Sequence, residues 1–391
     1  MKKYLSLVRR IITYYILWRL AFVFGCLRPV NKRLAVFAYN KNYSSLPDNL
    51  LFIKNVFEKA GWQCVEYASP KSASKRFLSD IKFQFLYAKS AVVFLNDNFD
   101  PVCAHKPRKG SRVVQLWHGC GAFKKFGYST LDSQWGGDKR EWKLFPRHNT
   151  YTDVFVSSQK VVPCYAEAFN CGENIIKPLG VPRTDVFFDK SFVSKGKSEL
   201  EKAIPEISGR KIILYAPTFR GNNPDDAYND NNIDFEKFRV LSEKCVIILK
   251  YHPFTAKKEN FTAEQKEKFG DFIYVCPDEI GVDTAMCAAD MVISDYSSLV
   301  FEYSLLNRPM IFFAYDYKQY NNTRSYYYKY EDFVPGPVVK SDDELIDVIL
   351  NGVDMRKIAD FREKFMSACD GSSSQRIAEY IINDIESSDK K

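Results

Sequence analysis

Several patterns that would assign this sequence to a common class of protein are missing. Its ten cysteines contain no CxxC pair, and no Cys/His group has the spacing of a zinc site. There is no Walker A pattern, no GxGxxG fingerprint and no DxD-like pair, so neither a P-loop nor a dinucleotide site is indicated, and no metal site is expected. Scattered cysteines without a cleavable secretory signal predict buried thiols in a reducing, cytoplasmic compartment.

A long hydrophobic run is also missing. The longest uncharged runs near the N-terminus, residues 11–18 and 20–27, are much shorter than the ~20 residues that cross a bilayer. Residues 1–28 instead predict an amphipathic helix whose cations fill an arc of about 200°, and we expect it to lie on an anionic membrane surface, peripherally, at the cytoplasmic face. The alternative is that its apolar side packs on the protein's own body. That side consists of Tyr4, Leu7, Val8, Ile11, Tyr14, Tyr15, Trp18 and Phe22.

The net charge of +8 comes from the N-terminus alone. Of the 56 basic side chains, eight lie within the first 33 residues, where there is no acid, and the remainder balance the 48 acidic ones. A neutral body lacks the broad electrostatic footprint of a protein that binds a phosphate backbone. Nucleic acid is therefore not expected as a partner.

Length and apolar pattern predict two doubly wound α/β domains. A chain of 391 residues exceeds one core of ordinary size, and short apolar runs alternate with helical patterns as in parallel βαβ units. We predict a membrane-associating segment at residues 1–31 and Rossmann-like domains at 32–190 and 191–391, facing a cleft where ligands bind beyond the strand ends. The final helices, residues 341–387, either cap the second domain or return to the first. Strands are expected at residues 33–39, 91–96, 112–117, 153–158, 211–216, 245–250, 272–276, 291–294 and 310–315.

One histidine of the first domain is placed for chemistry. His118 follows the apolar run that ends at residue 117, and a glycine-bearing loop with Lys124 and Lys125 comes next. A histidine just past a buried strand can accept a proton from a hydroxyl. A structural histidine bonded to a backbone carbonyl is the alternative, and the residue alone favours it.

Two strand ends of the second domain carry donors suited to phosphate. Thr218 and Arg220 follow one run, and His252 follows the next. The planar fork of an arginine and the single directed donor of a histidine suit a pyrophosphate. The alternative is a strand-end arginine paired with a local acid and a histidine stiffened by the proline after it.

A helix start follows a third strand of this domain. Asp295 follows the strand, Ser297 or Ser298 is the expected N-cap, and Glu302 lies one turn into the helix. Free backbone N–H groups at such a start can hold a phosphate, and Glu302 can accept hydrogen bonds from ribose hydroxyls. Capping and helix-end electrostatics are the alternative roles.

The order of these motifs resembles one family. The stretches QLWHG, LGVPRTD, YAPTFR, KYHPF, SDYSSLVFEY and RPMIFF lie in this order between about residues 110 and 340, and they are similar to those of the CDP-glycerol glycerophosphotransferases, the teichoic-acid primases and polymerases. The resemblance implies a GT-B-like fold and transfer of glycerol phosphate from CDP-glycerol to a hydroxyl of a lipid-linked or saccharide acceptor, with release of CMP. It implies no required cofactor.

Residue roles carry over from the resemblance position by position. His118 matches the family's catalytic base, with Lys124 and Lys125 on the acceptor side. The chain departs from the family after WHG, where Cys120 and Gly121 replace the usual Thr-Pro. The implied donor-site residues are Arg220, His252, Ser297 and Ser298 for the pyrophosphate, and Thr218, Asp295 and Glu302 for the nucleotide.

Other functions stay open at this point. CDP-ribitol is an alternative donor, because glycerol and ribitol differ only beyond the phosphate. The leading expectation places the transfer from CDP-glycerol in teichoic-acid-like or capsular polymer synthesis. A glycosyltransferase that uses a nucleotide sugar on the same fold is the main enzymatic rival. A non-catalytic membrane-surface protein is a third possibility, which would not depend on His118.

Overall fold

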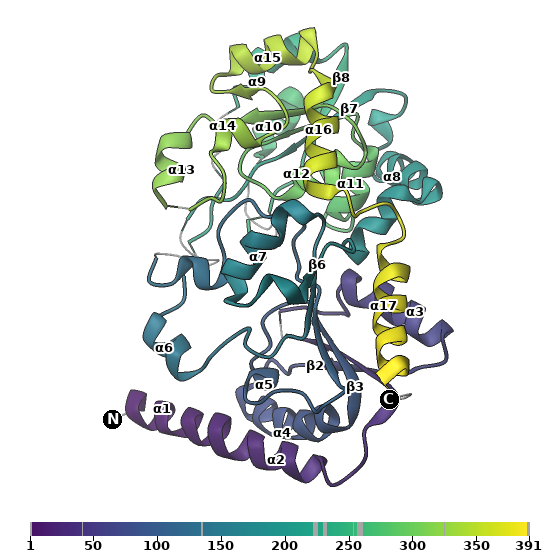
Figure 1. Cartoon of the computed structure of the whole chain (residues 1–391). Helices are drawn as coiled ribbons and strands as arrows, with labels where there is room; N and C mark the ends of the chain where they lie inside the picture. The colour runs from purple at the N-terminus through teal and green to yellow at the C-terminus, as the bar shows by residue number, and fades with distance from the viewer. Residues whose placement is uncertain are drawn as a thin grey trace. The chain divides into compact units, whose positions relative to one another are not determined.

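The chain folds into two compact α/β units (Figure 1). A computed structural model describes residues 2–388 apart from residues 41, 134–135, 222–225, 230–232, 253, 256–260 and 324. The first unit comprises Met1–Asp185 and Ser367–Lys391, and the second comprises Val186–Met366. Of the ten cysteines, all free thiols, six are buried and four are partly buried, which largely agrees with the prediction.

The first unit is built on a parallel sheet in the order β2-β1-β3-β4-β5-β6. Apolar side chains of β1 and β3 stack on α3 at the centre of this unit, where Phe37, Phe57 and Phe94 are fully buried. Its strands are β1 (Asn31–Tyr39), β2 (Gln63–Ala68), β3 (Ser90–Leu95), β4 (Arg112–Gln115), β5 (Asp153–Phe155) and β6 (Ile176–Lys177). Its helices are α3 (Asp48–Lys59), α4 (Ala73–Lys89), α5 (Asp100–Cys103), α6 (Lys139–Leu144), α7 (Val162–Phe169) and α17 (Ser373–Ser388), with α1 and α2 described below.

The second unit has a parallel sheet in the order β12-β11-β10-β7-β8-β9. The strand order reverses between β10 and β7, as it does between β1 and β3 of the first unit, and such points are where open α/β sheets bind ligands. The strands are β7 (Lys211–Ala216), β8 (Cys245–Leu249), β9 (Ile273–Val275), β10 (Met291–Ser294), β11 (Met310–Phe313) and β12 (Val338–Val339). The helices are α8 (Lys190–Ala203), α9 (Phe235–Phe238), α10 (Ala263–Phe269), α11 (Val282–Ala288), α12 (Leu299–Ser304), α13 (Tyr317–Thr323), α14 (Tyr330–Phe333), α15 (Asp342–Asn351) and α16 (Met355–Met366).

The last helix belongs to the first unit, whereas the prediction placed it in a second domain at residues 191–391. Helix α17 packs beside α3 on the sheet of the first unit, with Ile377 and Ile381 fully buried (Figure 1). Both carboxylate oxygens of Asp185 accept hydrogen bonds from the start of α17, at 2.9 Å from the Ser373 N–H and 2.8 Å from the Ser374 N–H. The chain therefore returns to the first unit, which was the second of the two alternatives for its final helices.

The N-terminal segment is helical as predicted, but its predicted apolar side covers the protein. It forms α1 (Lys2–Ile12), a π-helical turn (Thr13–Leu17) and α2 (Trp18–Gly25). Tyr14, Trp18 and Phe22 are buried, and the ring of Phe22 packs 5.1 Å from that of Tyr87 on α4. The Tyr14 hydroxyl donates to the Cys103 carbonyl at 2.6 Å. The self-packing alternative is thus correct for the second half of this side.

A different face of the same segment is exposed and aliphatic. Its side chains are between 41% and 80% exposed, and they recur at spacings of three, four and seven residues, which places them on one side of the helix. They are Leu5, Ile12, Ile16, Leu20 and Val23 of the helical segment, together with Leu27 in the turn directly after α2. No helix within the described part of the chain is both long and apolar enough to cross a membrane.

Candidate functional site

The polar residues singled out by sequence gather at the carboxyl edges of the two sheets. In the first unit Leu95, the last residue of β3, pairs with Gln115, the last residue of β4. Asp97 and His118 come two and three residues after these ends. Because parallel neighbouring strands end at the same edge, the two side chains meet there.

His118 and Asp97 form a hydrogen-bonded pair. The His118 Nδ1 lies 2.6 Å from an Asp97 carboxylate oxygen, and half of the histidine side chain is exposed. Because a carboxylate can only accept, Nδ1 carries the proton, which leaves Nε2 of a neutral ring as a proton acceptor. A histidine held in this way by a carboxylate is the arrangement of a general base.

The backbone around His118 is fixed by side-chain amides. Trp117 has a φ of +57°, a conformation that turns the chain sharply after β4. The Gln115 amide oxygen accepts from the Trp117 N–H at 2.8 Å, and its nitrogen donates to the Asp97 carbonyl at 3.0 Å. One side chain therefore holds both loops, the one that carries the base and the one that carries its carboxylate.

A pocket of about 320 Å³ opens beside His118. At its base Asn49 donates to the Trp117 carbonyl at 2.7 Å and to the Asn96 amide oxygen at 3.1 Å, and it accepts from the Arg183 N–H at 2.9 Å. The Arg183 guanidinium donates to the His118 carbonyl at 3.3 Å. Arg183 belongs to the LGVPRTD stretch, so this motif of distant sequence position lines the same pocket.

Lys124 and Lys125 lie on the loop after His118, and both are partly buried. The Lys125 ammonium pairs with Glu167 of α7 at 3.3 Å. This pair is half exposed, so it contributes little to stability. The acceptor-side role of both lysines stays a prediction.

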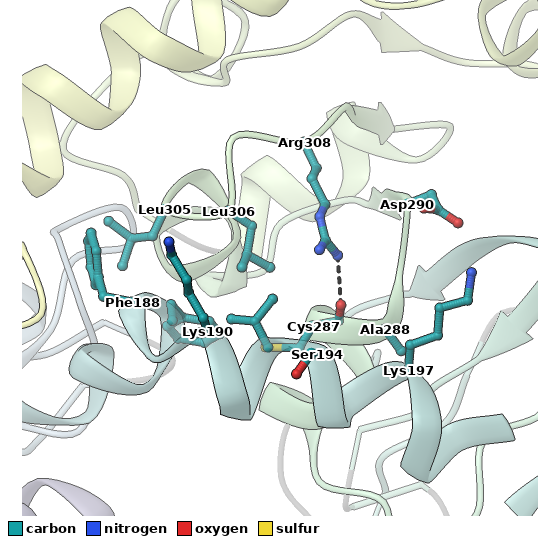
Figure 2. A pocket seen from close by; sticks show the side chains of 12 residues that line it. Phe188, Lys190, Ser194, Lys197, Cys287, Ala288, Asp290, Leu305, Leu306 and Arg308 are labelled. Carbon is teal, nitrogen blue, oxygen red and sulfur yellow. Dashed lines mark hydrogen bonds between the residues drawn. The ribbon is translucent and has the colours of Figure 1, made fainter. Parts of the chain in front are cut away.

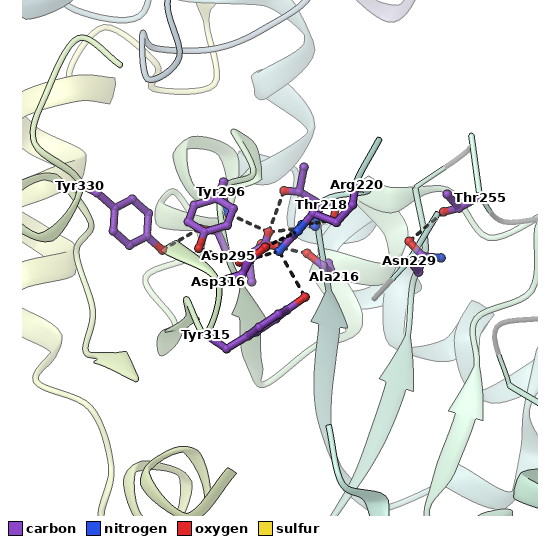
Figure 3. Close-up of polar contacts among 11 residues, drawn as sticks. Ala216, Thr218, Arg220, Asn229, Thr255, Asp295, Tyr296, Tyr315, Asp316 and Tyr330 are labelled. Atoms are coloured by element: carbon purple, nitrogen blue, oxygen red, sulfur yellow. Dashed lines mark hydrogen bonds and ion pairs between the residues drawn. The ribbon is translucent and has the colours of Figure 1, made fainter. Parts of the chain in front are cut away.

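In the second unit Arg220 is the centre of a buried ion-pair network (Figure 3). Its Nε lies 2.7 Å from one oxygen of Asp316 and its Nη2 lies 3.0 Å from the other, while its Nη1 lies 3.0 Å from Asp295. Arg220 is 7% exposed, and Thr218 donates to Asp295 through both its N–H, at 2.8 Å, and its hydroxyl, at 2.7 Å. Arg220 and Thr218 follow β7, Asp295 follows β10 and Asp316 follows β11, so three adjacent strands build the network.

This geometry corresponds to the alternative interpretation of Arg220, a strand-end arginine paired with local acids. The guanidinium also lies over the ring of Tyr320 at 4.9 Å and donates to the Thr218 carbonyl. Two carboxylates and an aromatic face occupy it, which leaves little of it to face a phosphate. Direct contact of Arg220 with a pyrophosphate stays a prediction.

His252 is oriented as a donor. Its Nδ1 accepts a hydrogen bond from the Phe254 N–H at 3.2 Å, so the proton of the neutral ring is on Nε2. The ring is partly buried and packs 4.7 Å from each of the rings of Phe219 and Phe254. These contacts fit a fixed donor to an anion.

The other donor-site candidates surround the start of α12. The Ser297 hydroxyl accepts from the Leu299 N–H at 3.3 Å, Ser298 is exposed, and Glu302 is 4% exposed within the helix. Glu302 is buried, whereas a residue that binds a ribose would be open to the ligand. The two serines are partly or fully exposed at the carboxyl edge of the sheet. Across the described residues, no group of three or more His, Cys, Asp or Glu side chains could hold a metal ion.

A larger pocket of the second unit lies at the other edge of its sheet (Figure 2). It measures about 460 Å³, and its lining includes Asp290, which directly precedes β10. The Arg308 guanidinium donates to the Cys287 carbonyl at 2.7 Å and so caps the end of α11. None of the predicted site residues lines it, so the carboxyl edges remain the candidate site.

Two α/β units, each built on a parallel sheet with polar motifs at its carboxyl edge, define a GT-B-like protein. The fold agrees with a solved structure of the wall teichoic acid polymerase TagF, at a TM-score of 0.75 and 20% identity, over 98% of this chain and 95% of that one. The family model of CDP-glycerol:poly(glycerophosphate) glycerophosphotransferase matches residues 21–383. The chain belongs to this family.

Curated relatives agree with the family. The chain is 36% identical to the teichoic acid ribitol-phosphate polymerase TarK of Staphylococcus aureus, over 79% of this chain and 59% of that protein. It is 38% identical to the teichoic acid ribitol-phosphate primase of Bacillus spizizenii, over 75% of each chain. The chain spans about half the length of the three ribitol-phosphate polymerases it matches, from 49% to 59%.

Proposed function

We propose that this protein transfers an alditol phosphate from a CDP-alditol to a hydroxyl of a lipid-linked or saccharide acceptor and releases CMP. The pair of His118 and Asp97, 2.6 Å apart, carries the proposal, because His118 lines a pocket and this family's reaction needs a base at the attacking hydroxyl. Family membership over residues 21–383 supports the donor class.

The proposed reaction needs a base for the acceptor hydroxyl and donors for the departing CMP. Nε2 of His118 takes the proton of the acceptor hydroxyl as its oxygen bonds to the phosphorus that bears the alditol. The bond from that phosphorus to the CMP oxygen breaks, and CMP leaves with the electron pair. A positioned base contributes roughly 10²- to 10⁴-fold, and donors such as His252 Nε2 and the Ser297 hydroxyl would stabilise the charge that develops on CMP.

Two alditols, glycerol and ribitol, are candidates for the donor, because enzymes named for each of them are among the relatives of this chain. Relatives named as glycerol-phosphate enzymes are 25–30% identical to this chain, in agreement with the CDP-glycerol prediction. Relatives named as ribitol-phosphate enzymes are 36–38% identical. CDP-ribitol is therefore the second candidate donor. A teichoic-acid-like polymer is the proposed product, with a capsular polymer as the alternative.

The purified protein is expected to release CMP from one CDP-alditol only when an acceptor is present. CDP-glycerol and CDP-ribitol should be supplied in turn, with a crude lipid-linked acceptor or without it, and CMP quantified by chromatography. A phosphodiester product would establish the reaction class. Folded protein that is silent with both donors, but forms a glycosidic bond from a nucleotide sugar, would replace this proposal with the glycosyltransferase hypothesis.

We also propose that the protein works at the cytoplasmic face of a membrane, held by the exposed aliphatic face of α1 and α2. The side that covers the protein cannot serve, because Trp18 and Phe22 are buried in it. Exposed side chains of the other face lie near Arg9 and Arg28, also exposed, and this mixture of aliphatic and cationic groups suits an anionic interface.

Val23→Glu is expected to weaken binding to anionic vesicles by roughly tenfold, because a carboxylate replaces an apolar contact at a negative surface. Val240→Glu is the matched control, since Val23 and Val240 are 62% and 60% exposed and Val240 lies in the second unit. Co-sedimentation measures both. Equal binding of the two variants would rule out this face as the anchor. Deletion of residues 1–28 is a poorer test, because it would uncover Tyr87 and His105 beneath Phe22.

A further inference from the structure

A pocket of about 380 Å³ lies beneath the N-terminal helix, outside the site described above. Its walls come from α1, the π-helical turn, the first residues of α2 and α5, α4, and the chain at residues 145–146. They combine cations, carboxylates and aromatic rings. The cations are Arg9, Arg10 and Arg76, the carboxylates are Asp80 and Asp100, and the apolar walls include Trp18, Phe77 and Phe145.

The arginines present guanidinium groups over aromatic walls. Arg9 lies over the ring of Phe77 at 5.6 Å and is exposed, and Arg10 lies over Phe145 at 4.1 Å while it pairs with Glu141 at 2.8 Å. The Nε and Nη2 of Arg76 donate to backbone carbonyls at 3.0 and 2.9 Å, which fixes its position on α4. Guanidinium forks are suited to the oxygens of a phosphate.

Two buried polar groups line the same pocket. Trp18 is 8% exposed, and its indole N–H is buried without a hydrogen-bond acceptor among the described residues. Asp80 is 6% exposed and accepts from the Tyr67 hydroxyl at 3.1 Å, and burial raises the pKa of its carboxyl to about 6. Near neutral pH this carboxylate is mostly ionised and can accept from a hydroxyl, while the indole N–H can donate to one.

We propose that this pocket binds the head group of an anionic phospholipid that carries hydroxyls, of the phosphatidylglycerol kind. The phosphate would face Arg9 and Arg76, and the glycerol hydroxyls would face Asp80 and the Trp18 indole. A bare anion would leave the carboxylates unmatched, whereas a polyol phosphate satisfies both signs of the lining. The proposal rests on the membrane association proposed above, because the exposed aliphatic face of the same helix would bring the pocket to the lipid head groups.

The direct test is a calorimetric titration with a short-chain phosphatidylglycerol below its critical micelle concentration. The unaltered protein is expected to bind it. Arg9→Gln should weaken binding roughly tenfold, because a charge-assisted hydrogen bond is lost. Ser6→Phe should abolish binding by filling the pocket, since Ser6 is an exposed lining residue, without any change of charge. Arg28→Gln, which removes an exposed cation outside the pocket, should leave the affinity unchanged.

Several results would overturn the proposal. The first is that the unaltered protein does not bind the lipid, and the second is that Arg9→Gln and Arg28→Gln weaken lipid binding equally. The third is that inorganic phosphate displaces the bound lipid as effectively as free lipid does at the same concentration, which would assign the pocket to a free anion. Phosphatidylcholine of the same chain length should not compete. Val23→Glu separates this proposal from the membrane anchor, because it should weaken vesicle binding and leave binding of the monomeric lipid unchanged. CMP release with a soluble acceptor should be unchanged in Arg9→Gln, so the transfer reaction is tested separately.

Discussion

His118→Ala is expected to lower the rate of transfer by at least roughly 10²-fold and to leave donor binding intact. The side chain is half exposed and stands after the end of β4, so its removal should not disturb the fold. The loss has a simple origin, since the hydroxyl of an alditol or sugar is a weak acid and needs an acceptor for its proton. CMP release at saturating acceptor measures the rate, and calorimetry with the CDP-alditol measures donor affinity.

Asp97→Asn is the companion variant, and it tests whether Asp97 positions the base. An amide at this place can donate as well as accept, so it no longer fixes the proton on Nδ1 of His118. We expect kcat to fall while the KM of the donor stays unchanged, with partial recovery in Asp97→Glu. Loss of donor affinity in His118→Ala would move the histidine to the donor site. Full activity in Asp97→Asn would show that the 2.6 Å contact does not orient the base.

Apolar patterning was sufficient to find most of the strands. All nine expected runs overlap a strand, because strands covered on both faces by helices read as continuous apolar runs. Three strands were not predicted. Strand β2 is an edge strand whose residues are exposed or partly exposed, and β6 and β12 are two residues long, so none of them leaves an apolar run in the sequence.

The site was harder to predict, because its partners depend on strand order. His118 was found from its place after an apolar run, but Asp97 follows a strand whose neighbour cannot be read from sequence. Its one signal was a carboxylate directly after the strand predicted at residues 91–96. The partners of Arg220 could not be predicted for the same reason. Its motif suggested a phosphate ligand, and only the adjacency of β7, β10 and β11 reveals Asp295 and Asp316 beside it.

The N-terminal helix illustrates a different limit. Its period of apolar residues predicted the helix, but two apolar sides share the segment, and periodicity cannot tell which of them meets the protein. Phe22 and Trp18 pack on the body because they fit α4 and the chain around Cys103, and this choice depends on tertiary partners.

Arg220→Met should destabilise the second unit by roughly 3–5 kcal/mol, because it leaves two largely buried carboxylates without their cation. The side chains of Asp295 and Asp316 are 4% and 13% exposed, so water cannot readily replace the guanidinium. Arg220→Lys is expected to recover little, since one ammonium cannot span both carboxylates as the planar fork does. Arg356→Met is the control, because Arg356 pairs with Asp354 at the surface with 89% of its side chain exposed, and its loss should not move the unfolding midpoint.

The chain offers an internal reporter for this measurement. All five tryptophans lie in the first unit, so their fluorescence follows that unit, while far-UV circular dichroism includes the second. In urea, Arg220→Met should move the dichroism transition to lower denaturant more than the fluorescence transition. The double variant Arg220→Met with Asp316→Asn should recover part of the lost stability, because it removes one of the two carboxylate charges that have lost their cation. An Arg220→Met protein with an unchanged midpoint that no longer binds the CDP-alditol would show the opposite, that the guanidinium contributes to the donor and not to the fold.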